Sequence, residues 1–330
     1  MTGAAAQVGA IVELAGPHVP ALLARVEERL AELARGHGPE LAEHASATIA
    51  AGGKRLRPLL VVLASGRPED ADQRLLLAAA AAVELVHSAT LVHDDVLDGA
   101  QLRRGLPTVW ARAGRKPAVA TGDLLFSRAF AELAATGSLA AVRSLSRASS
   151  ALAEGELLQR QDAWNGAVTV QRYLYRCELK TARLFEASCE LGALAASRDP
   201  EASAALGAFG RRIGLAFQLL DDVLDVCGPP SATGKQRGAD LLDGTVTLPL
   251  ILARRHEREL ASIDLRSVST PAAAAELCDR IEASGALDEA RARSLAIVAE
   301  AKQGIATLAL DAGQRAALAL VADSVVARSS

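Results

Sequence analysis

Helical spacing of apolar residues runs through almost the whole of this 330-residue chain. Apolar side chains recur three and four positions apart, and no stretch sustains the alternation with β-branched residues that predicts a strand. The apolar residues are mainly Ala, Leu and Val, and Ala and Leu are among the strongest helix formers. The sequence therefore predicts an all-α fold, and its length is close to the upper limit for one domain.

Glycine and proline clusters divide the helical pattern into segments. The first apolar run, from Ile11 to Leu33, is broken at Gly16-Pro17, because proline is not accommodated inside a helix. We find no low-complexity linker, heptad pattern or repeat of fixed period, so one domain over residues 1–330 is the simplest interpretation. Further helices are predicted at Pro58–Ala64, Gln73–Asp98, Lys116–Ala135, Leu139–Arg160, Val168–Ala196, Pro200–Val226, Thr247–Glu259, Thr270–Ala283 and Asp288–Val326.

Overall charge, apolar stretches and cysteine spacing exclude several classes of protein. A net charge of −3 argues against a general nucleic-acid-binding protein. The chain begins without a secretory signal pattern, and its most apolar stretch, Leu75–Val86, is about 12 residues long where a membrane span needs about 20. We expect a soluble cytoplasmic protein with no transmembrane segment and with reduced cysteines, at Cys177, Cys189, Cys227 and Cys278.

Two segments carry the same acidic pattern, D-D-x-x-D, each after an apolar helical run. At about 100° per residue, the three aspartates of each pattern lie on one face of a helix. Like charges on one face repel each other and are costly beside an apolar core unless cations compensate them. The aspartates are Asp94, Asp95 and Asp98 in the first motif and Asp221, Asp222 and Asp225 in the second.

Carboxylates without paired histidines or cysteines suit a hard divalent ion. Mg²⁺ typically takes a few carboxylates and completes its shell with phosphate oxygens and water, and Mn²⁺ could substitute for it. A single motif of this kind is more typical of a solvated acidic face. Two copies on otherwise apolar segments favour metal binding.

Basic residues beside glycines follow or precede these motifs and could bind phosphate. Lys54, Arg55 and Arg57 stand next to Gly52-Gly53, where the backbone can approach an anion closely. Two further basic pairs each follow an acidic motif: Arg103 with Arg104, and Lys235 with Arg237. Each cluster alone is typical of a solvated loop, but the repeated pairing with an acidic helix end indicates a phosphate site.

Other catalytic patterns are missing from the sequence. His87 and His93 are not at the spacing of a helical zinc pair, and Glu84-x-x-His87 is only half of a di-iron motif. The chain contains no G-x-S-x-G, P-loop or G-x-G-x-x-G pattern, which removes support for a serine hydrolase or a nucleotide-binding protein.

The motifs, taken in order, resemble those of the trans-polyprenyl diphosphate synthases of the isoprenoid synthase fold. The resemblance covers about residues 52–249 and is closest in pattern to bacterial medium- and long-chain synthases. It rests on Gly52–Pro58, Val83–Gly105, Gly122–Leu125, Ala153–Glu156, Lys180-Thr181-Ala182, Phe217–Asp225 and Gly234–Leu248. It implies a single-domain helical bundle around a deep apolar cavity, a homodimer, and Mg²⁺-assisted transfer of the allylic group of an allylic diphosphate onto isopentenyl diphosphate, with release of diphosphate.

The resemblance also implies roles for individual residues. Asp94, Asp98 and Asp221 would be direct metal ligands, with the other three aspartates close by. Isopentenyl diphosphate would be held by the Gly52–Pro58 cations and two further residues, namely Lys54, Arg55, Arg57, His87 and Arg104. The allylic diphosphate would be held by Arg103, Lys180, Thr181, Gln218 and Lys235. The reaction would run through ionisation, condensation and elimination, with the departing diphosphate able to accept the final proton.

One position departs from the family pattern, and two others bear on product length. Thr245 stands where a lysine facing the allylic diphosphate is usual, a loss worth about 1.5–3 kcal/mol of binding unless another cation, such as Arg237, replaces it. Ala89 and Thr90, one turn before Asp94, are small where short-chain relatives carry aromatic residues. We therefore expect a deep channel and a product longer than 15 carbons.

Two other functions fit part of the pattern. A class I terpene cyclase would share metal-assisted ionisation, but it would have no use for a second set of phosphate-binding cations. A non-catalytic subunit of a heteromeric synthase would explain Thr245, but such a subunit would be expected to lose its acidic motifs, and both are intact here.

Overall fold

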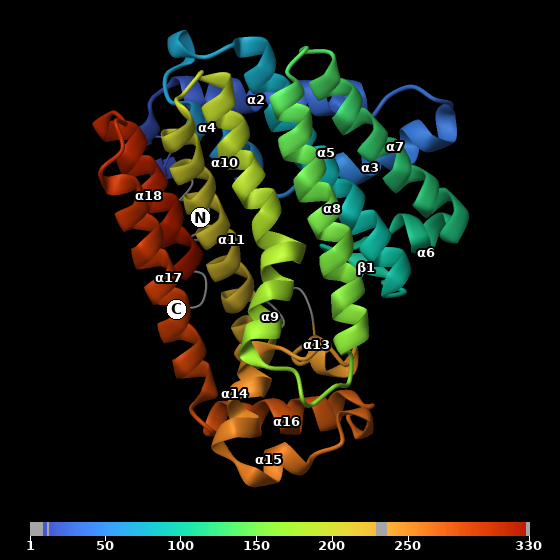
Figure 1. Ribbon diagram of the computed structural model, residues 1–330. Helices are drawn as coiled ribbons and strands as arrows, with labels where there is room; N and C mark the ends of the chain where they lie inside the picture. Colours follow the sequence, from blue (N-terminus) through green and yellow to red (C-terminus); the bar gives the residue numbers. More distant parts are fainter. Residues whose placement is uncertain (1–8, 12, 229–235, 328–330) are drawn as a thin grey trace. The chain divides into compact units, whose positions relative to one another are not determined.

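The computed structural model of the chain (Figure 1) describes residues 9–11, 13–228 and 236–327. Regular structure in these residues is almost entirely helical, which confirms the predicted all-α fold. The exception is a hairpin of two antiparallel strands, β1 (Leu102–Arg103) and β2 (Leu106–Pro107). Strands of two residues are too short to show alternation in a sequence, so this hairpin was not predicted.

The chain divides into two compact units. Unit 1 takes in Met1–Ser149, Leu184–Gly210 and Ile305–Leu320, and unit 2 takes in Ser150–Arg183, Arg211–Gly304 and Val321–Ser330. Five helices have residues in both units: α8 (Leu139–Asp162), α10 (Arg183–Ala195), α11 (Pro200–Cys227), α17 (Ala286–Ala306) and α18 (Ala312–Val326).

Unit 1 is organised around the long helix α5 (Gln73–Leu97). Asp72 caps this helix by accepting hydrogen bonds from the backbone N–H groups of Arg74 and Leu75. Helices α7, α4 and α2 pack against α5. The elements of unit 1 other than α5 and the hairpin are α2 (His18–Leu33), α3 (Pro39–Ala50), α4 (Leu56–Ser65), η1 (Pro68–Asp70), α6 (Val109–Ala113), α7 (Arg115–Ala134) and α10 (Arg183–Ala195), whose first residue belongs to unit 2.

Helix α5 is long and apolar enough to cross a membrane by length and composition. However, 78% of its apolar window is buried inside the protein. Burial of that extent is what a core helix requires, since its side chains need apolar contacts on most sides.

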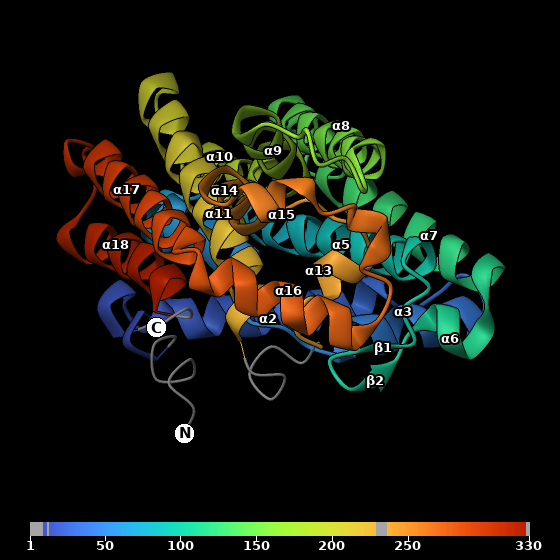
Figure 2. The ribbon, with the colours of Figure 1, turned by 90° about the horizontal axis from the view of Figure 1, so that it is seen from below.

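Unit 2 contains shorter helices, and one of them has an unusual hydrogen-bond pattern. The segment η2 is a π-helix between α9 and α10, and such turns often mark functional sites. Figure 2 shows α13 beside α16, and the two are in contact. The elements that belong to unit 2 alone are α9 (Val170–Cys177), η2 (Glu178–Ala182), α13 (Ala239–Leu242), α14 (Leu248–His256), α15 (Arg258–Ser262), η3 (Leu265–Ser267) and α16 (Pro271–Ala283).

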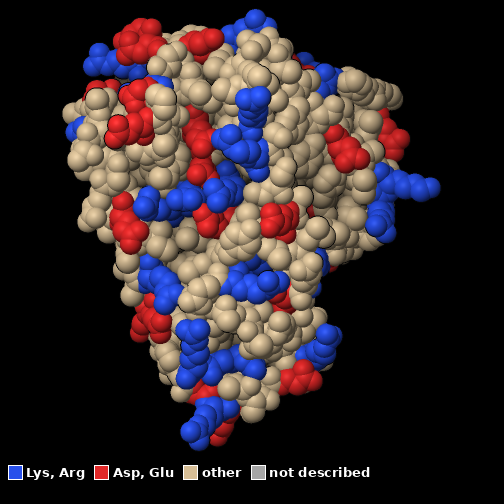
Figure 3. Space-filling view, viewed as in Figure 1, with Lys and Arg blue, Asp and Glu red and all other residues tan. Residues whose placement is uncertain are grey.

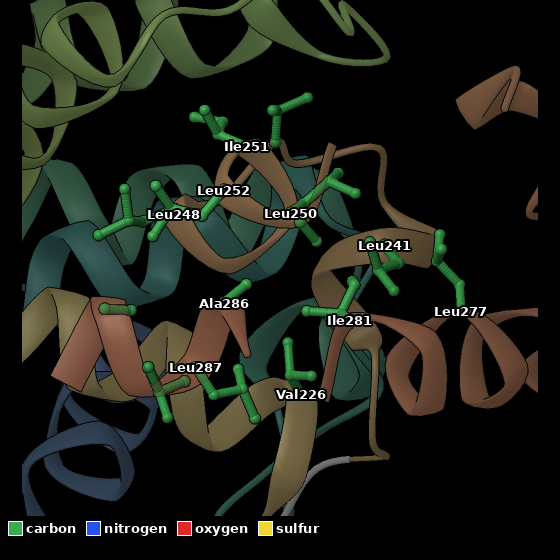
Figure 4. Packing of buried hydrophobic residues seen from close by; sticks show 14 of the residues in the cluster. Val226, Leu241, Leu248, Leu250, Ile251, Leu252, Leu277, Ile281, Ala286 and Leu287 are labelled. Atoms are coloured by element: carbon green, nitrogen blue, oxygen red, sulfur yellow. The ribbon is translucent and has the colours of Figure 1, made fainter. Parts of the chain in front are cut away.

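A cluster of buried apolar residues forms the core of unit 2 (Figure 4). Leu248 and Ile281 are fully buried, and α14 and α16, which carry them, are in contact. The cluster joins the end of α11 to α13, α14, α16 and α17 through residues that include Val226, Leu241, Leu248, Leu250, Ile251, Leu252, Leu277, Ile281, Ala286 and Leu287. It therefore fixes the end of α11, which carries the second acidic motif.

The charged side chains of the described residues are mixed on the face shown in Figure 3. Lysine and arginine residues lie next to aspartate and glutamate residues over much of this face. A nearly balanced sequence, with a net charge of −3, leads to such mixing.

Candidate active site

The predicted metal- and diphosphate-binding residues that the structure describes, together with side chains near them that were not predicted, fall into two clusters, one in each unit. The unit-1 cluster lies at the ends of α4 and α5 and on the hairpin. It contains Lys54, Arg55, Arg57, Glu84, His87, Asp94, Asp95, Asp98, Arg103 and Arg104. The unit-2 cluster lies on α8, α9, η2, α11 and α13. It contains Glu156, Tyr173, Lys180, Thr181, Gln218, Asp221, Asp222, Asp225 and Asp240.

The first acidic motif ends helix α5. Asp98 is the C-cap residue, and its backbone N–H donates to the carbonyl of Asp94 at 2.8 Å. Asp95 is buried and accepts from Arg103 on β1, at 2.8 Å from Nε and 2.7 Å from Nη2. Burial raises the pKa of Asp95 above its ordinary value, although Arg103 opposes this. The middle aspartate of the motif thus holds the hairpin, while Asp94 is partly exposed and Asp98 exposed.

A cavity of about 160 Å³ opens beside this motif. Its walls come from α3, α5, α6, the hairpin and the loop at Gly52, and they include His87, Asp95, Arg103 and Arg104. Gly53 has a φ of +155°, and a Cβ atom there would lie 3.1 Å from the Arg104 guanidinium. Glycine at this position therefore lets the backbone approach Arg104 closely.

The positive charge of Arg57 has little compensation from carboxylates within unit 1. Its guanidinium lies over the Phe185 ring, 4.6 Å from the centroid, and its Nε is buried without a hydrogen-bond partner. Burial lowers the pKa of Arg57 to about 10, a value at which the side chain is still charged at neutral pH. Burial, together with Arg57 and Arg104, lowers the pKa of His87 well below its ordinary value, so His87 is neutral. A partly buried cation with a buried, unpartnered Nε is costly unless an anion binds beside it.

Arg55, predicted to bind substrate, is engaged by other side chains. Its Nε and Nη2 donate to the carboxylate of Glu27, and its Nη1 donates to Glu84 at 2.8 Å. Arg55 also has a φ of +46° at the start of α4. Glu84, which is buried, therefore anchors the basic loop, a role that the sequence did not indicate.

In unit 2, the π-helical turn η2 presents Lys180 and Thr181. Lys180 Nζ lies 2.5 Å from Glu156 Oε2 on α8. A Cβ atom at Gly155 would lie 2.5 Å from the backbone nitrogen of Lys180, so α8 contacts the η2 backbone here. Figure 1 shows α8 running alongside α9 and this turn.

A chain of hydrogen bonds leads from η2 to the second acidic motif. Thr181 donates to Gln218 at 2.7 Å, and Gln218 donates to Asp222 Oδ1 at 2.8 Å. The fully buried Tyr173 donates its hydroxyl to Asp222 Oδ2 at 2.6 Å. Burial and the neighbouring charge of Asp240 raise the pKa of Asp222 to about 7. The middle aspartate is again held by protein groups, while Asp221 is exposed.

The segment after the second motif is attached to Asp225. Its carboxylate Oδ2 accepts from the backbone N–H of Asp240 at 3.2 Å, which caps α13. Thr245 donates its backbone N–H to the carbonyl of Asp240 at 2.8 Å. Arg237 pairs with carboxylates of α16, Asp279 at 2.5 Å and Glu282 at 3.2 Å. Arg237 therefore already has two carboxylate partners, and its replacement of the missing lysine stays a prediction.

Lys235, predicted to bind the allylic diphosphate, lies outside the described residues. Ala89 is fully buried in unit 1, and Thr90 is partly exposed, with its hydroxyl donating to the carbonyl of His87. Lys54 is exposed on the Gly52–Pro58 loop.

The donor set of the two motifs fits a hard divalent ion. Both middle aspartates are held by protein groups, whereas the predicted ligands Asp94, Asp98 and Asp221 are at least partly exposed. Among the described residues, no three acidic, histidine or cysteine side chains stand close enough to hold an ion by themselves. Carboxylates that are few in each unit suit Mg²⁺, because this ion completes its shell with water and phosphate oxygens.

Sequence reasoning missed the residues that orient the site, namely Glu84, Tyr173 and Asp240. One feature of the sequence could have drawn attention to Tyr173: it is one of only two tyrosines in the chain. Nothing in its local pattern points to Asp222, because that contact joins residues on two different helices.

An all-helical fold with two acidic motifs and phosphate-binding cations defines a class of metal- and diphosphate-binding proteins. The sequence model of the family described as "Polyprenyl synthetase" matches residues 38–279, and the chain belongs to this family. The family resemblance expected from the motifs is thereby confirmed.

Individual relatives agree with this assignment. Heptaprenyl diphosphate synthase component 2 of Geobacillus stearothermophilus is 39% identical over 274 residues, which cover 81% of this chain and 85% of that protein. Octaprenyl diphosphate synthase of Escherichia coli is 39% identical over 208 residues, which cover 63% of this chain and 64% of that protein.

Among solved structures, the chain is similar to a polyprenyl synthase from Caulobacter crescentus in complex with calcium and isoprenyl diphosphate. The two are 38% identical, with a TM-score of 0.90 over 96% of this chain and 98% of the other. A decaprenyl diphosphate synthase from Rhodobacter capsulatus matches at 33% identity with a TM-score of 0.87, covering 96% of this chain and 99% of the other.

Proposed function

We propose that the chain is a prenyl transferase that condenses isopentenyl diphosphate with an allylic diphosphate into an all-trans polyprenyl diphosphate longer than 15 carbons. The names of its relatives support this activity, since they include heptaprenyl and octaprenyl diphosphate synthases. The observation that carries the proposal is the pairing, in each unit, of a D-D-x-x-D motif with cations suited to phosphate.

The unit-1 cations are assigned to isopentenyl diphosphate. Arg57 and Arg104 supply guanidinium forks that match phosphate oxygens, Lys54 adds a point charge, and neutral His87 can donate a hydrogen bond. The anion would compensate the charge of the partly buried Arg57. Arg55 supports this loop through its carboxylate partners.

The remaining basic and polar residues are assigned to the allylic diphosphate. Lys180 and Thr181 offer donors from the η2 turn, and Gln218 links that turn to Asp222. Arg103 on β1 and Lys235 complete the set.

The residues promote ionisation of the allylic diphosphate by placing positive charge where the leaving group becomes anionic. Asp94, Asp98 and Asp221 would each be a ligand of Mg²⁺, which would supply further positive charge to the leaving group. The allylic cation then reacts with the double bond of isopentenyl diphosphate, and loss of a proton to the departed diphosphate completes the step. Apolar helix faces exclude water, which would otherwise capture the cation.

Several finer features belong to this proposal. The primer is dimethylallyl or geranyl diphosphate, Mn²⁺ can replace Mg²⁺, and Ala89 and Thr90 line the floor that sets product length. Residues 1–330 act as one catalytic domain, in a cytoplasmic homodimer.

The test is to incubate the purified chain with Mg²⁺ and geranyl diphosphate, with and without isopentenyl diphosphate, and to analyse the products by mass spectrometry. We expect polyprenyl diphosphates beyond 15 carbons only when both substrates and the metal are present. Hydrocarbon formed without isopentenyl diphosphate would indicate a cyclase. No product from the chain alone would indicate a subunit that needs a partner.

A further inference from the structure

Glu156 on α8 is held between two cations within unit 2. Its Oε2 accepts from Lys180 Nζ at 2.5 Å, and its Oε1 accepts from Arg160 Nε at 3.0 Å. Burial alone would raise the pKa of Glu156, but the ion pair and hydrogen bond with Lys180 hold it below its ordinary value. The Glu156 and Lys180 side chains are only 16% and 28% exposed, so solvent screens this pair less than a surface pair.

The backbone keeps these two side chains together. Gly155 lets α8 contact the η2 backbone at Lys180, where any larger residue would collide with it. Glu156 is the next residue on α8, so the packing of Gly155 also fixes the backbone of Glu156 beside the π-helical turn. The contact is therefore part of the packing of α8 on η2, and not a chance meeting of two long surface side chains.

The same turn is connected to the second acidic motif by hydrogen bonds. Thr181, next to Lys180, begins the hydrogen-bond chain through Gln218 to Asp222. A displacement of η2 would thus move both Lys180 and the support of the acidic motif.

We propose that Glu156 is a positioning residue that holds the Lys180 ammonium ready for the allylic diphosphate. This inference rests on the proposed function. An ammonium has three donors, and the bond to Glu156 uses one of them, which leaves donors for diphosphate oxygens. Lysine loses much rotational freedom when it is immobilised, so a side chain that is ordered before binding reduces that cost.

The test compares Glu156→Ala, Glu156→Gln, Lys180→Met and the double variant Glu156→Ala/Lys180→Met. We expect Glu156→Ala to raise the KM for geranyl diphosphate about tenfold, because the Lys180 side chain would then have to become ordered on binding. The KM for isopentenyl diphosphate should not change. Glu156→Gln should restore most of the affinity, because its amide oxygen can still accept from Lys180. The double variant should be no worse than Lys180→Met, because Glu156 acts through that lysine.

Glu154→Ala is the matched control on the same helix. Glu154 is exposed and accepts from the Tyr175 hydroxyl at 3.1 Å, so its loss should change neither KM. Independent effects in the double variant, or equal changes in both KM values, would show that Glu156 serves only the fold and would overturn the inference.

Binding of geranyl diphosphate by calorimetry, with Mg²⁺ and without the second substrate, separates this inference from the proposed function. Weaker binding by Glu156→Ala supports the inference even if the wild-type chain makes no product. Equal binding by Glu156→Ala and wild type overturns the inference while leaving prenyl transfer intact. A wild-type chain that neither binds geranyl diphosphate nor makes product overturns both.

Discussion

At the scale of single residues, the site is distinguished by how its charges are compensated. Arg55 has carboxylate partners on either side, as buried arginines usually do. Arg57, two residues later, stacks on Phe185 and has a buried Nε with no partner. A protein retains such a costly group when a ligand, rather than the fold, supplies the missing charge.

Replacing Arg57 by Met should therefore separate binding from stability. Methionine keeps the apolar contact with Phe185 but removes the cation. We expect the KM for isopentenyl diphosphate to rise about 10- to 150-fold, the equivalent of a charged hydrogen bond worth roughly 1.5–3 kcal/mol. The free energy of unfolding should stay the same or rise, since an uncompensated cation has been removed.

Steady-state kinetics and urea unfolding check this prediction, with Arg55→Met as the comparison. Arg55→Met leaves Glu27 and Glu84 without their cation, so it should lose stability. Lower stability of Arg57→Met with an unchanged KM would mean that Arg57 belongs to the core.

The charged residues of the site were identifiable from the sequence, whereas their partners were not. Repetition of D-D-x-x-D, with basic loops beside it, was enough to single out Asp95 and Asp222. Their partners Arg103 and Tyr173 depend on how a hairpin and a second helix pack, which no local pattern records. The sequence identified Arg103 through its basic motif and predicted that it binds the allylic diphosphate. In the structure Arg103 also donates to the carboxylate of Asp95.

At the scale of elements, helix positions followed from periodicity but helix interruptions did not. The predicted helix Val168–Ala196 contains the π-helical turn η2, and the predicted helix Asp288–Val326 is two helices, α17 and α18. Short helices α3, α6 and α13 were not predicted. The π-helical turn changes the hydrogen-bond pattern over only five residues, and that stretch is too short for hydrophobic periodicity to reveal it.

Gly155→Ala should disturb the contact between α8 and η2. The new Cβ would lie 2.5 Å from the backbone nitrogen of Lys180, a distance that requires the backbone to shift. We expect a loss of about 1–3 kcal/mol in the free energy of unfolding, as for overpacking elsewhere, together with a higher KM for the allylic diphosphate. Urea unfolding and kinetics measure the two effects.

Gly304→Ala is the matched control, because Gly304 lies within α17 with nothing near its missing Cβ. Alanine there should stabilise the protein by about 0.4–1 kcal/mol, by restricting the unfolded chain. If Gly155→Ala behaved like Gly304→Ala, the close contact on η2 would not matter for the fold.

At the scale of the whole molecule, the ordered series of motifs was more informative than composition. Composition gave an all-α fold, which many unrelated proteins share. The motifs gave the family, because their order along residues 52–249 is far more specific than any one of them, and the family model matches residues 38–279. Division of the chain into two compact units was not predicted, since no linker composition marks it and five helices have residues in both units.

Product length is a property of the whole molecule, because it depends on how far the growing chain can extend from the acidic motif. Ala89 lies one turn before Asp94 on α5 and is fully buried. Phenylalanine at this position should shorten the main product, and the series Gly, Ala, Leu, Phe should shorten it in order of side-chain volume. Mass spectrometry of the products at saturating isopentenyl diphosphate gives their length.

The size series also separates a blocked channel from a damaged core. Overpacking at a fully buried alanine costs about 1–3 kcal/mol, so Ala89→Phe should lower stability as well. A general loss of stability would reduce the amount of every product. If residue 89 instead limits the depth of the channel, the total amount of product should stay the same while the main product becomes shorter. If Ala89→Phe made less product of unchanged length, Ala89 would be part of the core of α5 and would have no role in setting the length of the chain.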